Sequence, residues 1–161
     1  MDFKKLVDAA ALKDKYYEID ERVEEICKEA FKGCDKLEEI VMPKKLKKID
    51  SEAFQGCSSL TKLTLPSRVA SIGRWAFYGC SGLTELTLPD SVASIGDGAF
   101  ICCSDLSKIT SLAEIPPVCG FKVFNGVNKT NCELIVPEGS VAAYTRAEDW
   151  NKFSNIRGFS K

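Results

Sequence analysis

The feature that most constrains the fold of this chain is a sequence block that returns every 23 residues. Ala-Phe-x-Gly-Cys occurs at residues 30–34, 53–57 and 76–80, and residues 99–103 repeat it with cysteine in place of glycine. Two further blocks keep the same step: apolar-x-x-Ile at Val23/Ile26, Leu46/Ile49, Val69/Ile72 and Val92/Ile95, and Leu-x-x-apolar-x-apolar-Pro starting at Leu37, Leu60 and Leu83. One such unit cannot bury its own apolar edge, so equivalent units must stack. The sequence therefore predicts a solenoid in which residues 23 apart form columns.

Each block predicts a local structure. Residues 60–65 alternate apolar and polar side chains, as in a half-buried strand, and Pro66 ends that strand because proline cannot donate to a ladder. Residues 69–72 predict a second short extended segment on the opposite wall of the coil. Residues 51–55 predict one helical turn, capped by Ser51 and stopped by Gly56 at a position of positive φ. The predicted fold is mostly β, with parallel sheets and short helical turns.

The ends of the chain predict caps on a single solenoid domain, residues 1–161. Residues 1–15 predict a helical cap, since Phe3, Leu6, Val7, Ala10 and Ala11 have helical spacing. Residues 16–130 hold the repeats, about five to six coils, with two extra residues after Ile109. Residues 131–161 supply the last strand, at 134–136, and a C-terminal cap. In this cap residues 140–147 are helical, and Trp150, Phe153 and Ile156 plug the open end.

Composition excludes several classes of function. A formal net charge of −1 leaves no excess of basic residues to displace phosphate counterions, so nucleic acid is not an expected partner. No apolar run approaches the roughly 20 residues that a membrane span needs, and membrane insertion is not expected. The N-terminus is amphipathic and does not have the form of a signal peptide, so either the protein stays inside the cell or a leader was removed.

The repeat blocks resemble those of a known family. Leu-x-x-Leu-x-Leu-Pro, Val-x-x-Ile-Gly and Ala-Phe-x-Gly-Cys at a 23-residue step are similar to the BspA-like leucine-rich repeats of bacterial surface proteins, and residues 123–153 resemble a C-terminal ending common in that family. The resemblance implies a leucine-rich-repeat solenoid that is secreted or displayed at the cell surface and binds other proteins, including host matrix components in some members. It implies no catalytic residue, no cofactor and no fixed ligand motif.

Eight cysteines need an explanation. Cys34, Cys57, Cys80 and Cys103 share one repeat position, which predicts an inward-pointing ladder of small buried hydrophobic residues. A straight column cannot surround one tetrahedral ion, and no Cys-x-x-Cys pair occurs. Cys119 and Cys132 flank the irregular repeat and remain candidates for a disulfide in an exported protein. An intracellular thiol-based metal-binding or redox protein is the alternative function that these residues keep open.

No constellation of residues predicts catalysis. The chain has no histidine, which removes the commonest general base and the commonest metal ligand. The abundant carboxylates, such as Glu24, Glu25, Glu38 and Glu39, fall on solvent-facing repeat positions. We therefore expect a non-catalytic protein-interaction or adhesion module, with a purely structural spacer or assembly unit, capable of self-association, as a further alternative.

Binding would be carried by outward-facing strand positions. These positions form a charged column, Glu39, Lys62, Glu85 and Lys108, and a threonine column, Thr64, Thr87 and Thr110. Part of the charged column is expected to pair with itself across neighbouring strands. Trp75 and Tyr78 form a second candidate patch, although packing between neighbouring turns explains them equally well. A face of about six strands offers roughly 500 Å², less than the roughly 800 Å² per partner of a standard interface. The expected ligand is a protein or a glycan.

Overall fold

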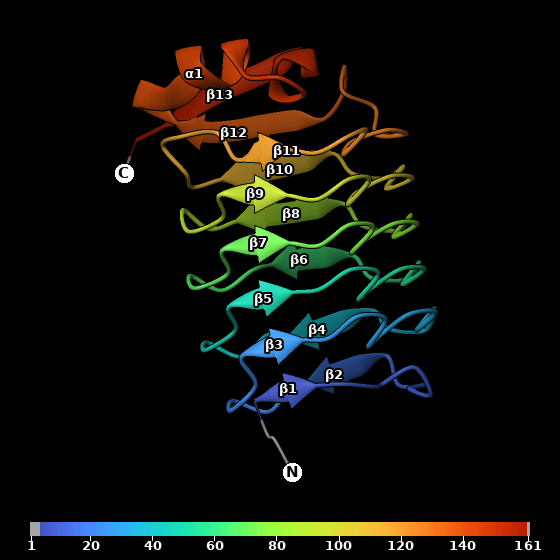
Figure 1. Ribbon diagram of the computed structural model, residues 1–161. Helices are drawn as coiled ribbons and strands as arrows, with labels where there is room; N and C mark the ends of the chain where they lie inside the picture. Colours follow the sequence, from blue (N-terminus) through green and yellow to red (C-terminus); the bar gives the residue numbers. More distant parts are fainter. Residues whose placement is uncertain (1–3, 161) are drawn as a thin grey trace.

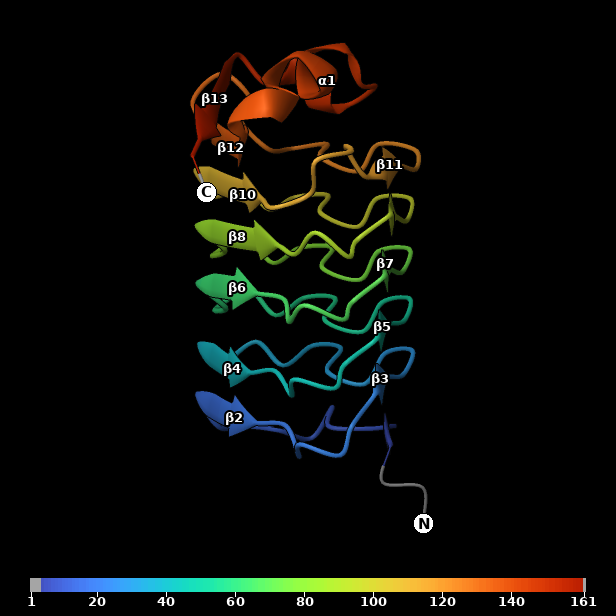
Figure 2. The same ribbon diagram turned by 90° about the vertical axis from the view of Figure 1, so that its left-hand side faces the viewer.

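The computed structural model describes residues 4–160 and is a parallel β-solenoid of about seven turns, more than the five to six expected. Two walls run along its length (Figures 1 and 2). The short-strand wall is a six-stranded sheet of β1 (Lys5–Leu6), β3 (Glu25–Ile26), β5 (Lys48–Ile49), β7 (Ser71–Ile72), β9 (Ser94–Ile95) and β11 (Val118–Cys119). The long-strand wall holds β6 (Lys62–Thr64), β8 (Glu85–Leu88), β10 (Lys108–Ser111), β12 (Glu133–Pro137) and β13 (Asn155–Phe159), and the pair β2 (Tyr16–Glu18) and β4 (Glu39–Val41) continues the same side.

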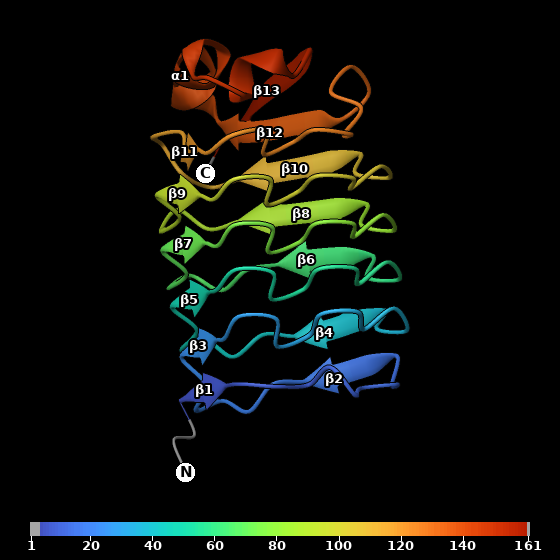
Figure 3. The same cartoon turned by 45° about the vertical axis from the view of Figure 1, so that its right-hand side comes forward.

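Strand register confirms the 23-residue columns. Ile49 pairs with Ile72, and Leu63 pairs with Leu86, each exactly one repeat apart in the sequence. The register between β10 and β12 is Lys108 to Glu133, which contains the two extra residues expected after Ile109. All pairs are parallel because every coil runs in the same sense (Figure 3).

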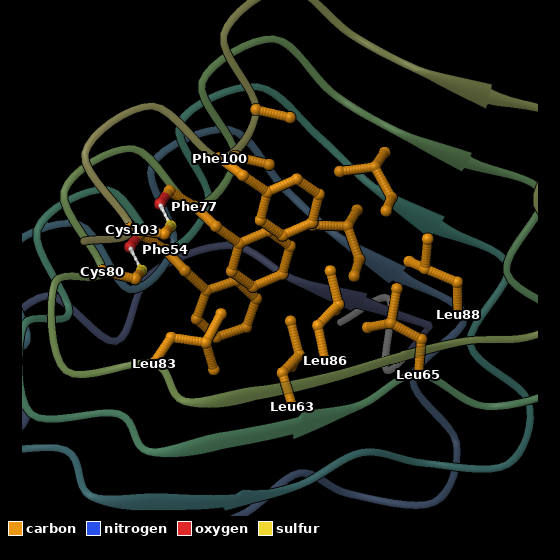
Figure 4. Close-up of a cluster of buried hydrophobic side chains, with 14 of the residues drawn as sticks. Phe54, Leu63, Leu65, Phe77, Cys80, Leu83, Leu86, Leu88, Phe100 and Cys103 are labelled. Atoms are coloured by element: carbon orange, nitrogen blue, oxygen red, sulfur yellow. Dashed lines mark hydrogen bonds between the residues drawn. The ribbon is translucent and has the colours of Figure 1, made fainter. Parts of the chain in front are cut away.

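The core between the walls contains an aromatic column. The rings of Phe31, Phe54, Phe77, Phe100 and Phe124 stack nearly parallel, with successive centroids 4.8, 5.1, 5.3 and 5.8 Å apart. Tyr17 closes one end edge-on at 5.5 Å, and Trp150 and Phe153 close the other. Figure 4 shows the stacked rings beside the leucine columns of the long-strand wall. Each ring packs against the ring of the next coil. Contacts between coils, more than contacts within one coil, therefore stabilise this part of the core.

The cysteine ladder points inward, as predicted, and its thiols add a second donor to carbonyls that already accept a backbone N–H. The thiols of Cys57, Cys80 and Cys103 donate to the carbonyl oxygens of Phe31, Phe54 and Phe77 at 3.2, 3.2 and 3.3 Å. Figure 4 shows the bonds of Cys80 and Cys103. Each bond links a cysteine to the phenylalanine of the coil below. A valine or alanine at this position would fill space but could not donate.

The predicted helical turns are wrong in detail. Residues 51–56 form a series of hydrogen-bonded turns and not a helix, because two of their residues have left-handed backbone. Gly56 has φ +77°, as expected, but Glu52 has φ +58°, and the same position in the next coil is Trp75 at φ +55°. Ser51 does not cap the turn with its side chain; its own N–H is bound by the Asp50 carboxylate at 2.7 Å.

The expected helical cap at the N-terminus is also wrong. Of its residues, 1–3 lie outside the described part, and residues 4–15 form β1 followed by turns. Leu6 pairs with Ile26 in the short-strand wall. The N–H of Ala9 bonds the carbonyl of Ala30 at 2.6 Å, as the N–H of Phe31 bonds Ala53. This segment is therefore a degenerate first coil, in which Ala9 takes the phenylalanine position.

The C-terminal end is closed by one short α-helix and two 3-10 helices of three residues each. These elements are η1 (Glu138–Ser140), α1 (Val141–Arg146) and η2 (Trp150–Lys152). Of the three residues expected to plug this end, Trp150 is fully buried and Phe153 is 3% exposed, whereas Ile156 is partly buried. Tyr144, which was not predicted as part of the plug, is also fully buried. Ile156 lies in β13, a further strand that the sequence did not predict. Ser111 replaces a leucine of the column, and the space it leaves holds Tyr144, whose hydroxyl lies 2.7 Å from the Ser111 hydroxyl.

Candidate binding surface

The outward face of the long-strand wall carries the predicted threonine column and three of the four residues of the predicted charged column in register. The fourth residue, Glu39, lies in β4, which pairs with β2 in a separate sheet. Lys62 lies beside Glu85, which lies beside Lys108, and Thr64, Thr87 and Thr110 run parallel to them. Lys62, Lys108 and Thr64 are exposed, whereas the other three side chains are half-buried. Side chains alternate across a strand, so these six residues share one surface.

The charged column is only partly self-paired. Lys62 and Glu85 form an ion pair at 3.5 Å, and Arg157 pairs with Glu133 on the next strands. Lys108 stands between Glu85 and Glu133, yet no salt bridge to it occurs among residues 4–160. Within the charged column, Lys108 is therefore the cation most available to a partner.

The two residues of the second candidate patch differ: Trp75 packs against its neighbours, and Tyr78 is exposed. The Arg74 guanidinium lies 3.8 Å from the centroid of the Trp75 ring. Trp75 also covers Gly98 of the next coil: a Cβ at Gly98 would lie 2.6 Å from Trp75 Cδ1. Trp75 thus contributes to contact between neighbouring turns, as the alternative interpretation held. Tyr78 is 37% exposed and is the more accessible ring of the two.

Sequence reasoning missed an apolar surface near the C-terminal end of the short-strand wall. Ile115, Val118 and Phe121 are 83%, 73% and 70% exposed. Ile115 and Val118 border a groove of about 700 Å³. The break in the repeat after Ile109 was the available signal, because residues outside the repeat pattern are not held in buried columns.

The thiols of Cys57, Cys80 and Cys103 are buried in the ladder and are not poised as nucleophiles. Burial raises the pKa of Cys57 and of Cys103 to about 12, and it raises the pKa of Cys80 as well. These groups are therefore protonated at neutral pH, whereas the thiolate is the nucleophile and the metal ligand. All eight cysteines are free, so Cys119 and Cys132 are not joined. Within residues 4–160 no group of His, Cys, Asp and Glu is arranged to hold a metal ion.

The model of the BspA type leucine-rich repeat region matches residues 12–131 in six copies. The chain belongs to the BspA-type leucine-rich repeat family. Solenoids of this kind are generally non-enzymatic, and their usual ligands are proteins. No curated protein matches the sequence.

Several solved bacterial structures are similar to this BspA-type chain. The pneumococcal vaccine antigen PcpA aligns with a TM-score of 0.75 at 20% identity, which shows the fold, over 99% of this chain and 45% of PcpA. The leucine-rich repeat protein of T. pallidum has a TM-score of 0.66 at 26% identity, over 91% and 74% of the two chains. A leucine-rich cell surface protein from Faecalibacterium prausnitzii has a TM-score of 0.65 at 26% identity, over 91% and 39%. This chain thus spans less than half of PcpA.

The family and these neighbours suggest a surface or extracellular location. Among the described residues, no helix has the length and apolar character to cross a membrane.

Proposed function

We propose that this chain is a non-catalytic protein-interaction module that acts in adhesion at the cell surface or outside the cell. The location is supported by the BspA-type repeats and by the similarity to a leucine-rich cell surface protein and to a pneumococcal antigen. The observation that carries the binding role is the outward face of the long-strand wall. There Lys108 has no ion pair within residues 4–160, and the threonine column lies beside it.

The contact surface that we propose consists of Lys62, Thr64, Glu85, Thr87, Lys108 and Thr110, with Tyr78 and the exposed edge of Trp75 as a second contact. Threonine hydroxyls both donate and accept hydrogen bonds, so the row suits a polar protein or glycan surface. Lys108 adds a cation that a partner carboxylate would pair with. The face is small for a standard interface, and we expect weak or multivalent binding.

The test is a binding screen with matched variants. Immobilised wild-type protein is presented to a panel of extracellular-matrix proteins and to a glycan array, and each hit is titrated by surface plasmon resonance. Lys108→Glu with Thr64→Arg is expected to weaken the hit at least tenfold. Ala70→Arg with Lys45→Glu makes the same charge changes at exposed positions away from this face and should leave binding unchanged. Equal affinity of both double variants for the hit would refute the role of this face.

A further inference from the structure

The loop between β10 and β11 departs from the repeat. Ser111 pairs with Leu88, and Val118 pairs with Ser94, so residues 112–117 occupy the place of residues 89–93 one coil earlier. The loop therefore contains one additional residue, and it displays Ile115 at 83% exposure. The regular coils carry no comparable side chain at this corner.

This loop is held rigidly at both ends. The Tyr144 hydroxyl donates to the carbonyl of Ala113 at 3.0 Å, and the Trp150 indole N–H donates to the carbonyl of Pro117 at 2.8 Å. Both donor side chains are fully buried in the C-terminal cap. The exposed apolar side chains therefore stand on a fixed backbone, and a ligand that contacts them loses little affinity to ordering the loop.

The loop and its neighbour enclose an apolar groove. The groove measures about 700 Å³ and is lined mainly by Val92, Ala93, Leu112, Ile115, Pro116 and Val118. A second groove of about 370 Å³ shares Asp90 and Leu112 with it and reaches Thr87 and Phe159. The first groove has the size and the apolar lining of sites that hold ligand-sized groups.

The charge of the residues that line the grooves indicates which kind of ligand would bind. The first groove includes the exposed Asp90, and none of the described residues lining either groove is a lysine or an arginine. A second copy of the chain, docked through the same groove, would bring the Asp90 carboxylate towards its own counterpart. A partner with a cation beside its apolar group would instead be attracted.

We propose that the groove binds an extended peptide segment of a partner protein in which an apolar side chain lies beside a lysine or an arginine. The apolar side chain packs against Ala93 and Val118, and the cation lies near Asp90. None of the six residues proposed for the face of the long-strand wall lines the first groove. The second groove, lined in part by Thr64 and Thr87, adjoins that face.

A phage-displayed library of random twelve-residue peptides, selected on the intact protein, tests this proposal. Enriched peptides are expected to share a large aliphatic or aromatic residue within two positions of a lysine or arginine. A synthetic peptide of that consensus should bind Ala93→Gln at least tenfold more weakly than wild type, because the larger polar side chain occupies the apolar contact without changing the charge, and Asp90→Asn at least threefold more weakly. Ala70→Gln is the matched control, because Ala70 is the exposed residue one repeat before Ala93, and it should bind like wild type.

No enrichment, an acidic consensus, or equal losses in Ala70→Gln and Ala93→Gln would overturn the proposal. Sedimentation of the wild type as a dimer that Ala93→Gln dissociates would show that a second copy occupies the groove, and the peptide site would be wrong. Circular dichroism melts of each variant establish that the folded state is retained.

Discussion

Replacing Cys57 with alanine should make the protein less sensitive to alkali. Cys57 is fully buried, its thiol donates to the Phe31 carbonyl, and burial raises its pKa from the ordinary value of 9.0 to about 12. In the unfolded chain the thiol ionises near pH 9, while in the folded protein it stays protonated. The contribution of this group to stability is therefore complete below pH 9 and is lost as the pH rises towards 12.

The magnitude follows from linkage. At pH 10.5 ionisation of one such thiol favours the unfolded chain by about 2 kcal/mol, and at pH 8 by less than about 0.1 kcal/mol. Cys103 has the same raised pKa, so the two thiols together cost about 4 kcal/mol, a large share of the roughly 5–15 kcal/mol that stabilises a typical domain. Cys57→Ala loses the thiol hydrogen bond and some packing, about 1–2 kcal/mol at pH 8. The deficit should shrink by about 2 kcal/mol at pH 10.5.

Urea unfolding, followed by circular dichroism in the presence of a reductant, measures this difference. Lysines and tyrosines also titrate in this range, but they are common to both proteins and cancel in the comparison. Cys102→Ala is the control, because Cys102 is exposed. A Cys57→Ala deficit that is the same at pH 8 and pH 10.5 would refute the assignment of a buried, protonated thiol.

Three further predictions concern stability. Cys102 has φ +60° at a position where the other coils carry glycine, so Cys102→Gly should relieve backbone strain and stabilise the protein by about 0.5–1 kcal/mol. Calorimetry should show Tm raised by about 1–4 °C, and a lower Tm would contradict this prediction. Tyr144→Phe removes the bonds to the Ser111 hydroxyl and the Ala113 carbonyl and should cost about 1–2 kcal/mol in urea unfolding, with a double-mutant cycle against Ser111→Ala showing non-additivity; strictly additive losses would exclude the contact. Lys62→Ala should change the free energy of unfolding by less than about 0.5 kcal/mol, because the ion pair of Lys62 with Glu85 is exposed. A larger loss of stability in urea unfolding would contradict this and would mean that an effect of Lys62→Ala on binding cannot be separated from an effect on folding.

Periodic residues were predictable because their positions are fixed by stacking. Phe54, Phe77 and Phe100 lie over one another as expected, since a 23-residue step returns each of them to the same place in the coil. The cysteine column was predictable for the same reason. The thiol hydrogen bonds were not, because they depend on the distance to a carbonyl of another coil.

The structure of the first coil was predicted wrongly because its sequence does not show the 23-residue repeat. Leu6 pairs with Ile26, twenty residues later, and Ala9 stands where the next coil has Phe31. A shortened repeat without its phenylalanine leaves apolar residues at spacings that also fit a helix. Two conformations were equally compatible with that pattern, and the neighbouring strand β3 decided between them.

The candidate site was predictable only where it belongs to a strand. The outward positions of Lys62, Thr64 and Glu85 follow from alternation along β6 and β8. The left-handed backbone at Trp75 has one sequence signal, the glycine at the same position of the next coil, Gly98, and this signal is weak because glutamate and lysine occupy that position in other coils. The groove at Ile115 depends on how one additional residue is accommodated, which no repeat pattern specifies.

The aromatic column has a consequence for how such a molecule can change in size. The contact between Phe54 and Phe77, 5.1 Å at 4°, is nearly the same as that between Phe77 and Phe100, 5.3 Å at 2°. Duplication of one such unit would present the same upper and lower surfaces that its neighbours already fit. Each added unit would lengthen the long-strand wall by about 4.8 Å. The length of the solenoid and the area of its outward face can thus increase one coil at a time, while the packing inside each coil stays the same.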